Sequence, residues 1–235
     1  MPAYSSEQCS CEWTISADVV ALDQAYYNNR MGTFQPEGMV FALKSDVVSN
    51  SSNTTDLTPG NVMLRPGKRA RPIVLRANVG DCLEVTFTNL LAEKSVASTN
   101  PVLGTVESPY DPNDPASAQW KPDEFAQFPT RESGIHAMGM QVCPVGSDDA
   151  ILSDGSWVGA NPSSLECPIG QEGGSANCLV GPGKIRTYKF FAGGEGTFLL
   201  YDAAAPIGQG PDFGGHPMLG TVWCCKRSTL WRTLV

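Results

Sequence analysis

Histidine and sulfur side chains, which hold copper in many proteins, are the residues here whose chemistry is most distinctive. His136 and His216 are the only histidines among 235 residues. Copper sites need neutral imidazoles and a thiolate, or a comparable soft ligand, held at fixed distances. Two imidazoles are too few to supply a multinuclear copper cluster.

His136 and Met138 form the best candidate pair of metal ligands. Residues two apart on a strand point to the same face, so this pair could bind Cu(I), with Cys143 as a further soft ligand. The alternative is a histidine that is hydrogen-bonded in the core or at an interdomain surface. His216 lies in a Gly/Pro-rich loop, where the ordinary interpretation is a solvated side chain, and it could join His136 only if the fold brings them together.

The eight cysteines do not follow the spacing of a structural zinc site. Cys9-x-Cys11 and the adjacent Cys224-Cys225 lack the separation of two to four residues that zinc ligands show, and no histidine cluster accompanies them. Cys167 and Cys178 bracket a Gly-rich insertion, and they are the pair most favoured for a disulfide, which would contribute about 2–3 kcal/mol.

Two further cysteines, Cys82 and Cys143, fall on expected strands and could pair with each other or stay reduced in the core. Cysteines in polar, turn-rich settings favour an oxidising compartment, so we expect an extracytoplasmic (periplasmic or secreted) protein. No signal peptide is visible, since residues 1–7 lack a basic start and an apolar core.

Other chemistries have weaker support. Ser156 does not fit the G-x-S-x-G pattern of a hydrolase nucleophile, and Ser133 is close to His136 only in sequence. The acidic stretches 111–114 and 148–149 could bind Ca²⁺ or Mn²⁺ through oxygen, but such residues are more often solvated.

Charge and hydropathy exclude two classes of partner. A net charge of −8 argues against a nucleic-acid surface. The sequence contains no apolar run of about 18 residues, which is the length that would predict a membrane span. The segment 65–71 is locally basic, with four cations in seven residues. It is either a solvated turn or a contact surface for a partner domain.

The elements that would position these residues are strands. With 24 Gly, 18 Pro and no segment of helical period, the sequence predicts an all-β sandwich or barrel of roughly eight short strands. Within 78–89, period-2 alternation is strongest at 83–88, and 13–24 predicts a first strand with one buried face. The stretch 133–143 predicts one strand, and 186–191 with 196–202 predict a hairpin. The other expected strands are 39–44, 71–76 and 218–223. Residues 92–130 predict a long loop.

Several segments, in order, resemble the amino-terminal cupredoxin domain of large multicopper oxidases, especially the bacterial manganese-oxidase-like ones. The most specific is Gly-Asp-Cys-Leu-Glu-Val-Thr-Phe-Thr-Asn-Leu-Leu at 80–91. The other segments are 17–24, 29–32, 38–43, 71–76, 136–141, 153–161 and 196–201. The resemblance implies a cupredoxin-like Greek-key β-sandwich with long loops over residues 12–222, preceded by an N-terminal extension, 1–11.

The same resemblance implies that the copper ligands are incomplete. Where catalytic relatives have an HxHG strand, this chain keeps His136 and has Met138 in the second position. Where they have a later HxH pair, it has Tyr201 and Ala203. The type 1 copper site belongs to a later domain, so this chain alone is not expected to oxidise phenols or Mn²⁺.

The resemblance favours a structural domain that packs against further cupredoxin domains or subunits of an oxidase. It stops at about residue 222, so 223–235 is expected to be an atypical tail on a truncated chain. Two alternatives stay open. One is a copper-free binding module that uses the acidic loops or the 65–71 turn; the other is a small copper-binding protein built on His136, Met138 and possibly His216.

Overall fold

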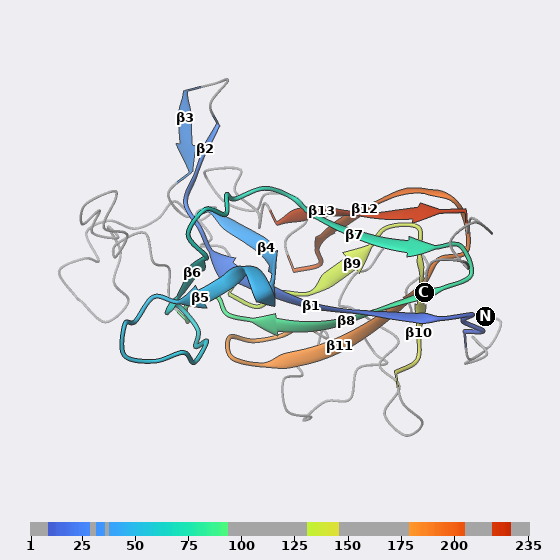
Figure 1. Cartoon of the computed structure of the whole chain (residues 1–235), viewed down its shortest axis with the longest axis horizontal. Coiled ribbons are helices and arrows are strands. Elements are labelled where there is room, and N and C mark those ends of the chain that lie inside the picture. Colours follow the sequence, from blue (N-terminus) through green and yellow to red (C-terminus); the bar gives the residue numbers. More distant parts are fainter. Residues whose placement is uncertain are drawn as a thin grey trace, which may run out of the picture.

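A computed structural model describes residues 9–28, 32–35, 38–93, 131–145, 179–204 and 218–226. The described strands gather into two main sheets, with no α-helix among these residues (Figure 1). The five-stranded sheet has the order β10 (Gln141–Cys143), β11 (Ile185–Phe191), β8 (Cys82–Asn89), β1 (Thr14–Asp23), β4 (Met39–Leu43). The four-stranded sheet has the order β7 (Ile73–Asn78), β13 (Leu219–Cys225), β12 (Gly196–Asp202), β9 (Ile135–Ala137).

Two short ribbons accompany these sheets. They are the pairs β2 (Tyr26–Asn28) with β3 (Thr33–Gln35), and β5 (Val47–Ser49) with β6 (Val62–Leu64). A single 3-10 turn, η1 (Lys44–Asp46), joins β4 to β5. No helix in the described residues is long and apolar enough to cross a membrane.

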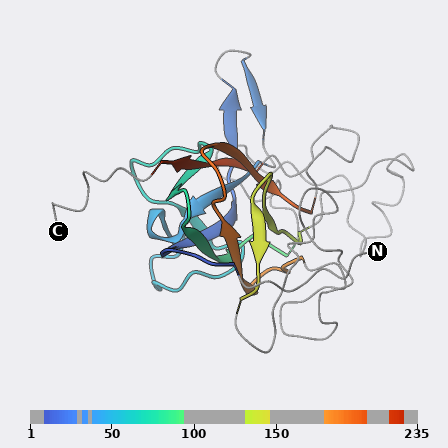
Figure 2. The same ribbon diagram turned by 90° about the vertical axis from the view of Figure 1, so that its right-hand side faces the viewer.

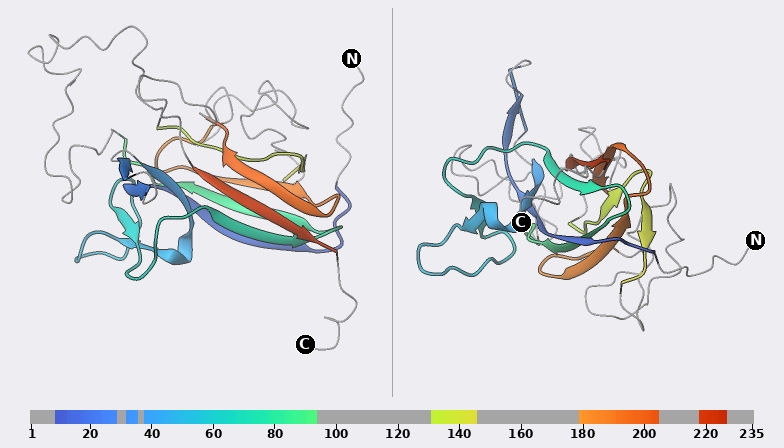
Figure 3. Two further views of the ribbon diagram at one scale, coloured as in Figure 1. Left: turned by 90° about the horizontal axis from the view of Figure 1, so that it is seen from above. Right: turned by 45° about the vertical axis from the view of Figure 1, so that its right-hand side comes forward.

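The two main sheets form the layers of a sandwich. β1 pairs in parallel with β8 and β7 in parallel with β13, whereas the other neighbours in both sheets are antiparallel. The layers are seen along the long axis of the molecule in Figure 2, and from above the long strands of both layers run in nearly one direction (Figure 3, left). The cupredoxin-like Greek-key β-sandwich expected from the sequence is confirmed.

The core lies between the two layers. The apolar side chains of the alternating segment 83–88 point into it, as predicted. Leu83, Val85 and Phe87 are buried there, and the Phe87 ring meets that of Phe41 edge-on, with centroids 5.9 Å apart. Strand β1 differs from the expectation of one buried face. Its second half is buried on both faces, because a second apolar cluster, which includes Val47 of β5 and Val62 of β6, covers the side that faces away from the main core.

Two strand pairings were predicted wrongly. β11 and β12 do not form a hairpin, because β11 pairs with β8 in the five-stranded sheet and β12 pairs with β13 in the four-stranded sheet. The single strand expected at 133–143 is broken by a turn at 138–140, where Gly139 has φ 84°, so β9 and β10 join different sheets. Local alternation is the same in either sheet, so it could not distinguish these partners.

Both alternatives for Cys82 and Cys143, a disulfide with each other and reduced thiols in the core, were wrong. Cys143 is bonded to Cys9 and Cys82 to Cys11, so two cysteines on sheet strands each meet a cysteine that precedes β1. Cys167 and Cys178, the pair most favoured from the sequence, lie outside the described residues. Folded structure extends beyond both expected domain boundaries. Residues 9 and 11 of the N-terminal extension are joined to the sandwich by disulfides, and β13 continues three residues past 222.

A buried ion pair joins the end of β1 to residue 131. The Arg131 guanidinium donates to both carboxylate oxygens of Asp23, at 2.5 and 2.7 Å, and to the carbonyl oxygen of Ala92 at 2.7 Å. The backbone N–H of Ala92 donates to Asp23 at 2.8 Å. Asp23 therefore holds together the two described segments, ending at 93 and beginning at 131, between which the expected long loop lies outside the described residues.

Candidate functional site

Two adjacent strands of the four-stranded sheet position His136. It lies on β9 directly opposite Tyr201 of β12, and the two ring centroids are 4.9 Å apart at an interplanar angle of 57°. Both side chains point away from the core, because their strand neighbours Ala137 and Leu200 point into it. His136 is nonetheless fully buried and Tyr201 nearly so.

A buried carboxylate fixes the strand ends beside this ring pair. Asp202 accepts hydrogen bonds from the Ser133 hydroxyl at 3.2 Å, from the Gly134 N–H at 3.0 Å and from the Ala204 N–H at 2.9 Å. Ser133 thus contributes its hydroxyl to a structural bond at the start of β9. This arrangement holds the backbone around His136 and Tyr201 in one register.

Met138 lies on the same outward face as His136, as the two-residue spacing predicts, but in different surroundings. Its backbone N–H donates to the Leu199 carbonyl at 2.8 Å, which continues the pairing with β12 beyond the end of β9. The Met138 side chain is exposed, whereas His136 is buried. The prediction that Cys143 could act as a soft ligand was wrong, because its sulfur is bonded to that of Cys9 and cannot act as a thiolate. His216 and Ser156 lie outside the described residues.

His136, Tyr201 and Ala203 do not fit the copper cluster that catalytic members of the resembled family would hold. The ring facing His136 is a phenol rather than a second imidazole, and Ala203 carries no donor atom in its side chain. Among the residues that the structure describes, no three His, Cys, Asp or Glu side chains come together in a group that could hold a metal ion. We therefore assign no reaction step to copper in this chain.

Comparison with known proteins gives one kind of match. No protein-family model and no curated protein matches the sequence. Copper proteins are among the solved structures that it resembles. A multicopper oxidase from Pseudomonas thermotolerans is 16% identical with a TM-score of 0.42, and the match covers 92% of this chain and 30% of that one.

Two further copper proteins match over similar lengths. The copper nitrite reductase from Nitrosomonas europaea is 14% identical with a TM-score of 0.38, and the match covers 92% of this chain and 42% of that one. A second multicopper oxidase is 16% identical with a TM-score of 0.36, covering 90% and 42%. The chain thus spans less than half the length of each of these structures.

An exposed apolar row crosses the outward face of the four-stranded sheet. Val74 of β7, Leu199 of β12 and Met138 are 55%, 41% and 46% exposed. The strand register aligns them, because Val74 and Leu199 both pair with Thr221 of β13, and Met138 bonds to Leu199. We call these three residues with Trp223 the outward apolar row.

Trp223 extends this row toward the C-terminal end of β13. Its indole is 46% exposed, and the Arg76 guanidinium carbon lies 5.2 Å from the ring centroid, a cation–π distance. The sequence did not predict this surface, since Trp223 was assigned to the atypical tail and Met138 to a metal site. The available signal was alternation: because Val222 points inward, Trp223 on the same strand must point outward.

Proposed function

We propose that the chain is the amino-terminal cupredoxin-like domain of a manganese-oxidase-like multicopper oxidase. Its role is structural: it packs against a further cupredoxin domain or subunit of the oxidase and has no complete copper centre of its own. The observation that carries this proposal is the outward apolar row on the four-stranded sheet. The family resemblance in the sequence supplies the class of partner.

The two outward faces of the sandwich differ in a way that supports docking through one of them. On the five-stranded sheet, the facing positions are mostly polar, with Lys189 opposite Glu84 and Thr187 opposite Thr86. Ile185 is the exposed apolar exception at the end of β11. On the four-stranded sheet, the outward apolar row takes one exposed residue from each of β7, β12 and β13 and one, Met138, from just after β9, with the half-buried Thr221 between Val74 and Leu199. A single polar face is ordinary for a soluble sandwich, whereas a contiguous exposed apolar row marks a contact surface.

Two members of the row, Trp223 and Met138, are of residue types enriched in protein contacts, and so is Arg76, which lies over the Trp223 ring. Fully burying one exposed apolar side chain contributes about 1.5–3 kcal/mol, and Trp223, Leu199 and Met138, which are already more than half buried, would each contribute less than that.

Copper oxidation of phenols or Mn²⁺ is not proposed for the chain alone. His136 is the one imidazole in the described residues, and the ring opposite it belongs to Tyr201. We place the protein in an extracytoplasmic compartment, because the Cys9–Cys143 and Cys11–Cys82 disulfides form most readily under oxidising conditions.

The docking proposal is tested by site-specific photo-crosslinking in the cells that naturally produce this chain. A photoreactive residue at Leu199 should form a crosslink to a polypeptide with cupredoxin domains, identified by mass spectrometry. The matched control carries the same residue at Thr187, on the outward face of the five-stranded sheet, and should give none. Equal crosslinking at both positions, or none at Leu199, contradicts the proposal.

A copper titration tests the competing interpretation. Under the structural role, the purified chain binds neither Cu(I) nor Cu(II) stoichiometrically. Stoichiometric binding that is lost in both His136→Ala and Met138→Ala would instead support the small copper-binding protein.

A further inference from the structure

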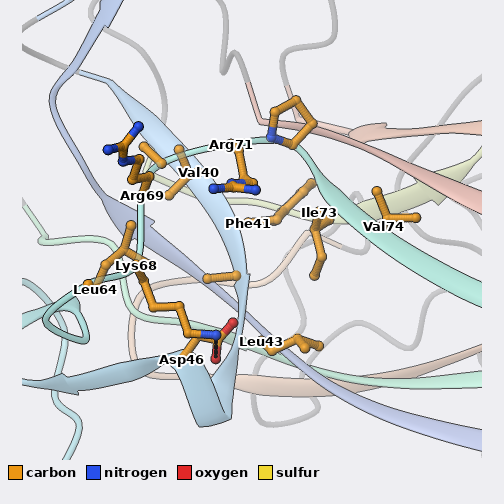
Figure 4. Close-up of a pocket in the computed structure, with 14 residues that line it drawn as sticks. Val40, Phe41, Leu43, Asp46, Leu64, Lys68, Arg69, Arg71, Ile73 and Val74 are labelled. Atoms are coloured by element: carbon orange, nitrogen blue, oxygen red, sulfur yellow. Dashed lines mark ion pairs between the residues drawn. The ribbon is translucent and has the colours of Figure 1, made fainter.

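A cavity of about 360 Å³ opens beside the free edge of β4, and Val74 of the outward apolar row is one of its lining residues (Figure 4). One wall is β4, which pairs with β1 on one side only and ends the five-stranded sheet. The other wall is the segment that leads from β6 to β7, and the first residues of β7 close one end. Pockets for small molecules begin at about this volume.

The floor of the cavity is apolar and belongs to the packed interior. Phe41 and Ile73 are members of the main core, and Val40 and Leu64 pack against the second apolar cluster. These side chains are held by the sandwich itself. Phe41 and Ile73 are only 2% and 8% exposed, so the partly exposed Val40 and Leu64 offer the apolar surface from which a ligand body would displace water.

The rim of the cavity is cationic. Lys68, Arg69 and Arg71 line it together with one carboxylate, Asp46, so two positive charges remain after the acid is counted. Lys68 is already paired with Asp46 at 2.8 Å, as the dashed line in Figure 4 marks. In a chain with a formal net charge of −8, this is a local reversal of sign.

The two arginines keep their binding capacity for a ligand. Arg65, by contrast, already donates two hydrogen bonds from its guanidinium to the carbonyl oxygen of Ser45, at 3.1 and 3.2 Å. Within the described part of the chain, neither Arg69 nor Arg71 has a hydrogen bond or an ion pair. Both are exposed, and Figure 4 shows the Arg71 side chain pointing into the cavity beside Phe41.

We propose that this cavity binds a small amphipathic carboxylate, with its apolar body against Val40 and Leu64 and its carboxylate on Arg71 and Arg69. The planar guanidinium presents paired donors that match the two oxygens of a carboxylate. The apolar floor selects against small hydrophilic anions, because these would leave the floor in contact with water. This inference does not depend on the outward apolar row or on copper.

The test is a calorimetric titration of the whole chain with octanoate and, as the neutral counterpart of equal chain length, with octan-1-ol. Octanoate should bind saturably at one site and more tightly than octan-1-ol. Arg71→Gln should weaken octanoate binding about tenfold, because a hydrogen bond to a charged group is lost. Arg71→Lys, which keeps the charge and loses the paired donors, should fall between the parent and Arg71→Gln.

The control variant is Lys184→Gln, which removes one exposed cation outside the cavity and should leave octanoate binding unchanged. All variants should unfold like the parent, since none of these side-chain cations makes a bond within the described structure. Three results would overturn the proposal. They are equal affinity for octanoate and octan-1-ol, equal weakening by Lys184→Gln and Arg71→Gln, and no saturable octanoate binding up to about 10 mM.

Discussion

The Tyr201 ring lies 4.9 Å from the His136 imidazole, on directly opposed positions of β12 and β9. From the sequence resemblance we expected a histidine at this place in catalytic multicopper oxidases. The strand register brings position 201 directly opposite His136, and the side chain there is a phenol. A single substitution at position 201 can therefore test whether the lack of a second imidazole is what prevents metal binding here.

Tyr201→His should create a metal site that the parent lacks. Directly opposed residues on antiparallel strands have Cβ atoms about 4.5–5.5 Å apart, which lets two imidazoles reach one ion. We expect Cu(II) to bind the variant at least about tenfold more tightly than the parent, because imidazole is a strong Cu(II) ligand. Absorption and paramagnetic resonance spectra recorded during a copper titration would measure this.

A matched control places the new histidine elsewhere on the same strand. Thr197→His lies four residues from Tyr201, opposite Trp223 rather than His136. It should leave copper affinity near that of the parent. If Thr197→His gains as much affinity as Tyr201→His, the pairing with His136 is not the cause.

The ion pair between Asp23 and Arg131 should contribute strongly to stability. Their side chains are 13% and 14% exposed, and Asp23 also accepts the Ala92 N–H. Asp23→Asn leaves a mostly buried guanidinium without its counter-charge, so we expect the free energy of unfolding to fall by about 2–4 kcal/mol. Urea denaturation followed by tryptophan fluorescence measures the change.

The comparison for this prediction is the Lys68–Asp46 pair, whose side chains are 50% and 29% exposed. Water screens such a pair, so Asp46→Asn should cost within about 1 kcal/mol. Equal losses in Asp23→Asn and Asp46→Asn would show that burial of the Asp23 pair adds nothing.

Period-2 alternation was enough to predict most of the strands, but it left a sandwich and a barrel open, and the resemblance to cupredoxins supplied the two-layer fold. In β8, for example, Leu83, Val85 and Phe87 point into the core while Glu84 and Thr86 point out, and this pattern is local. The partner of each strand is not local. β11 and β12 follow each other in the chain with similar alternation, yet contacts with residues far away in sequence place them in different sheets.

The candidate site was predictable to the same extent. Spacing correctly placed His136 and Met138 on one face of the sheet. Their different burial depends on what the rest of the chain places around each, and no two-residue pattern contains that information. The cysteine pairing failed for the same reason, because Cys9 and Cys143 are 134 residues apart in sequence.

The two disulfides should stabilise the sandwich by closing long loops in the unfolded chain. Cys11 and Cys82 are 71 residues apart, so their bond removes considerable freedom from the unfolded state. Replacing both by serine should cost about 2–4 kcal/mol. Thermal unfolding with and without a reductant measures this, and the double variant should lose less stability on reduction than the parent does. A parent that is insensitive to reductant would contradict the expectation.

The adjacent thiols Cys224 and Cys225 should differ in reactivity. Cys224 is buried in the core, and this burial raises the pKa of its thiol, with a smaller contribution from the neighbouring Cys225. Since the thiolate is the reactive form, iodoacetamide near pH 8 should label Cys225 well before Cys224 in the folded chain. Mass spectrometry of the labelled peptides distinguishes the two. Cys225→Ser should speed the labelling of Cys224 only slightly, because burial is the larger cause.

The same thiol should make stability fall at alkaline pH. Its ordinary pKa is 9.0, and the folded value is higher, so the folded state holds the proton more tightly than the unfolded state. The contribution to stability is therefore complete below pH 9.0 and is lost as the pH rises through the raised pKa. Cys224→Ala removes this contribution, so the variant's free energy of unfolding should decline less steeply above pH 9.0 than the parent's. Parallel declines in the two proteins would mean that Cys224 releases its proton equally in the folded and unfolded states.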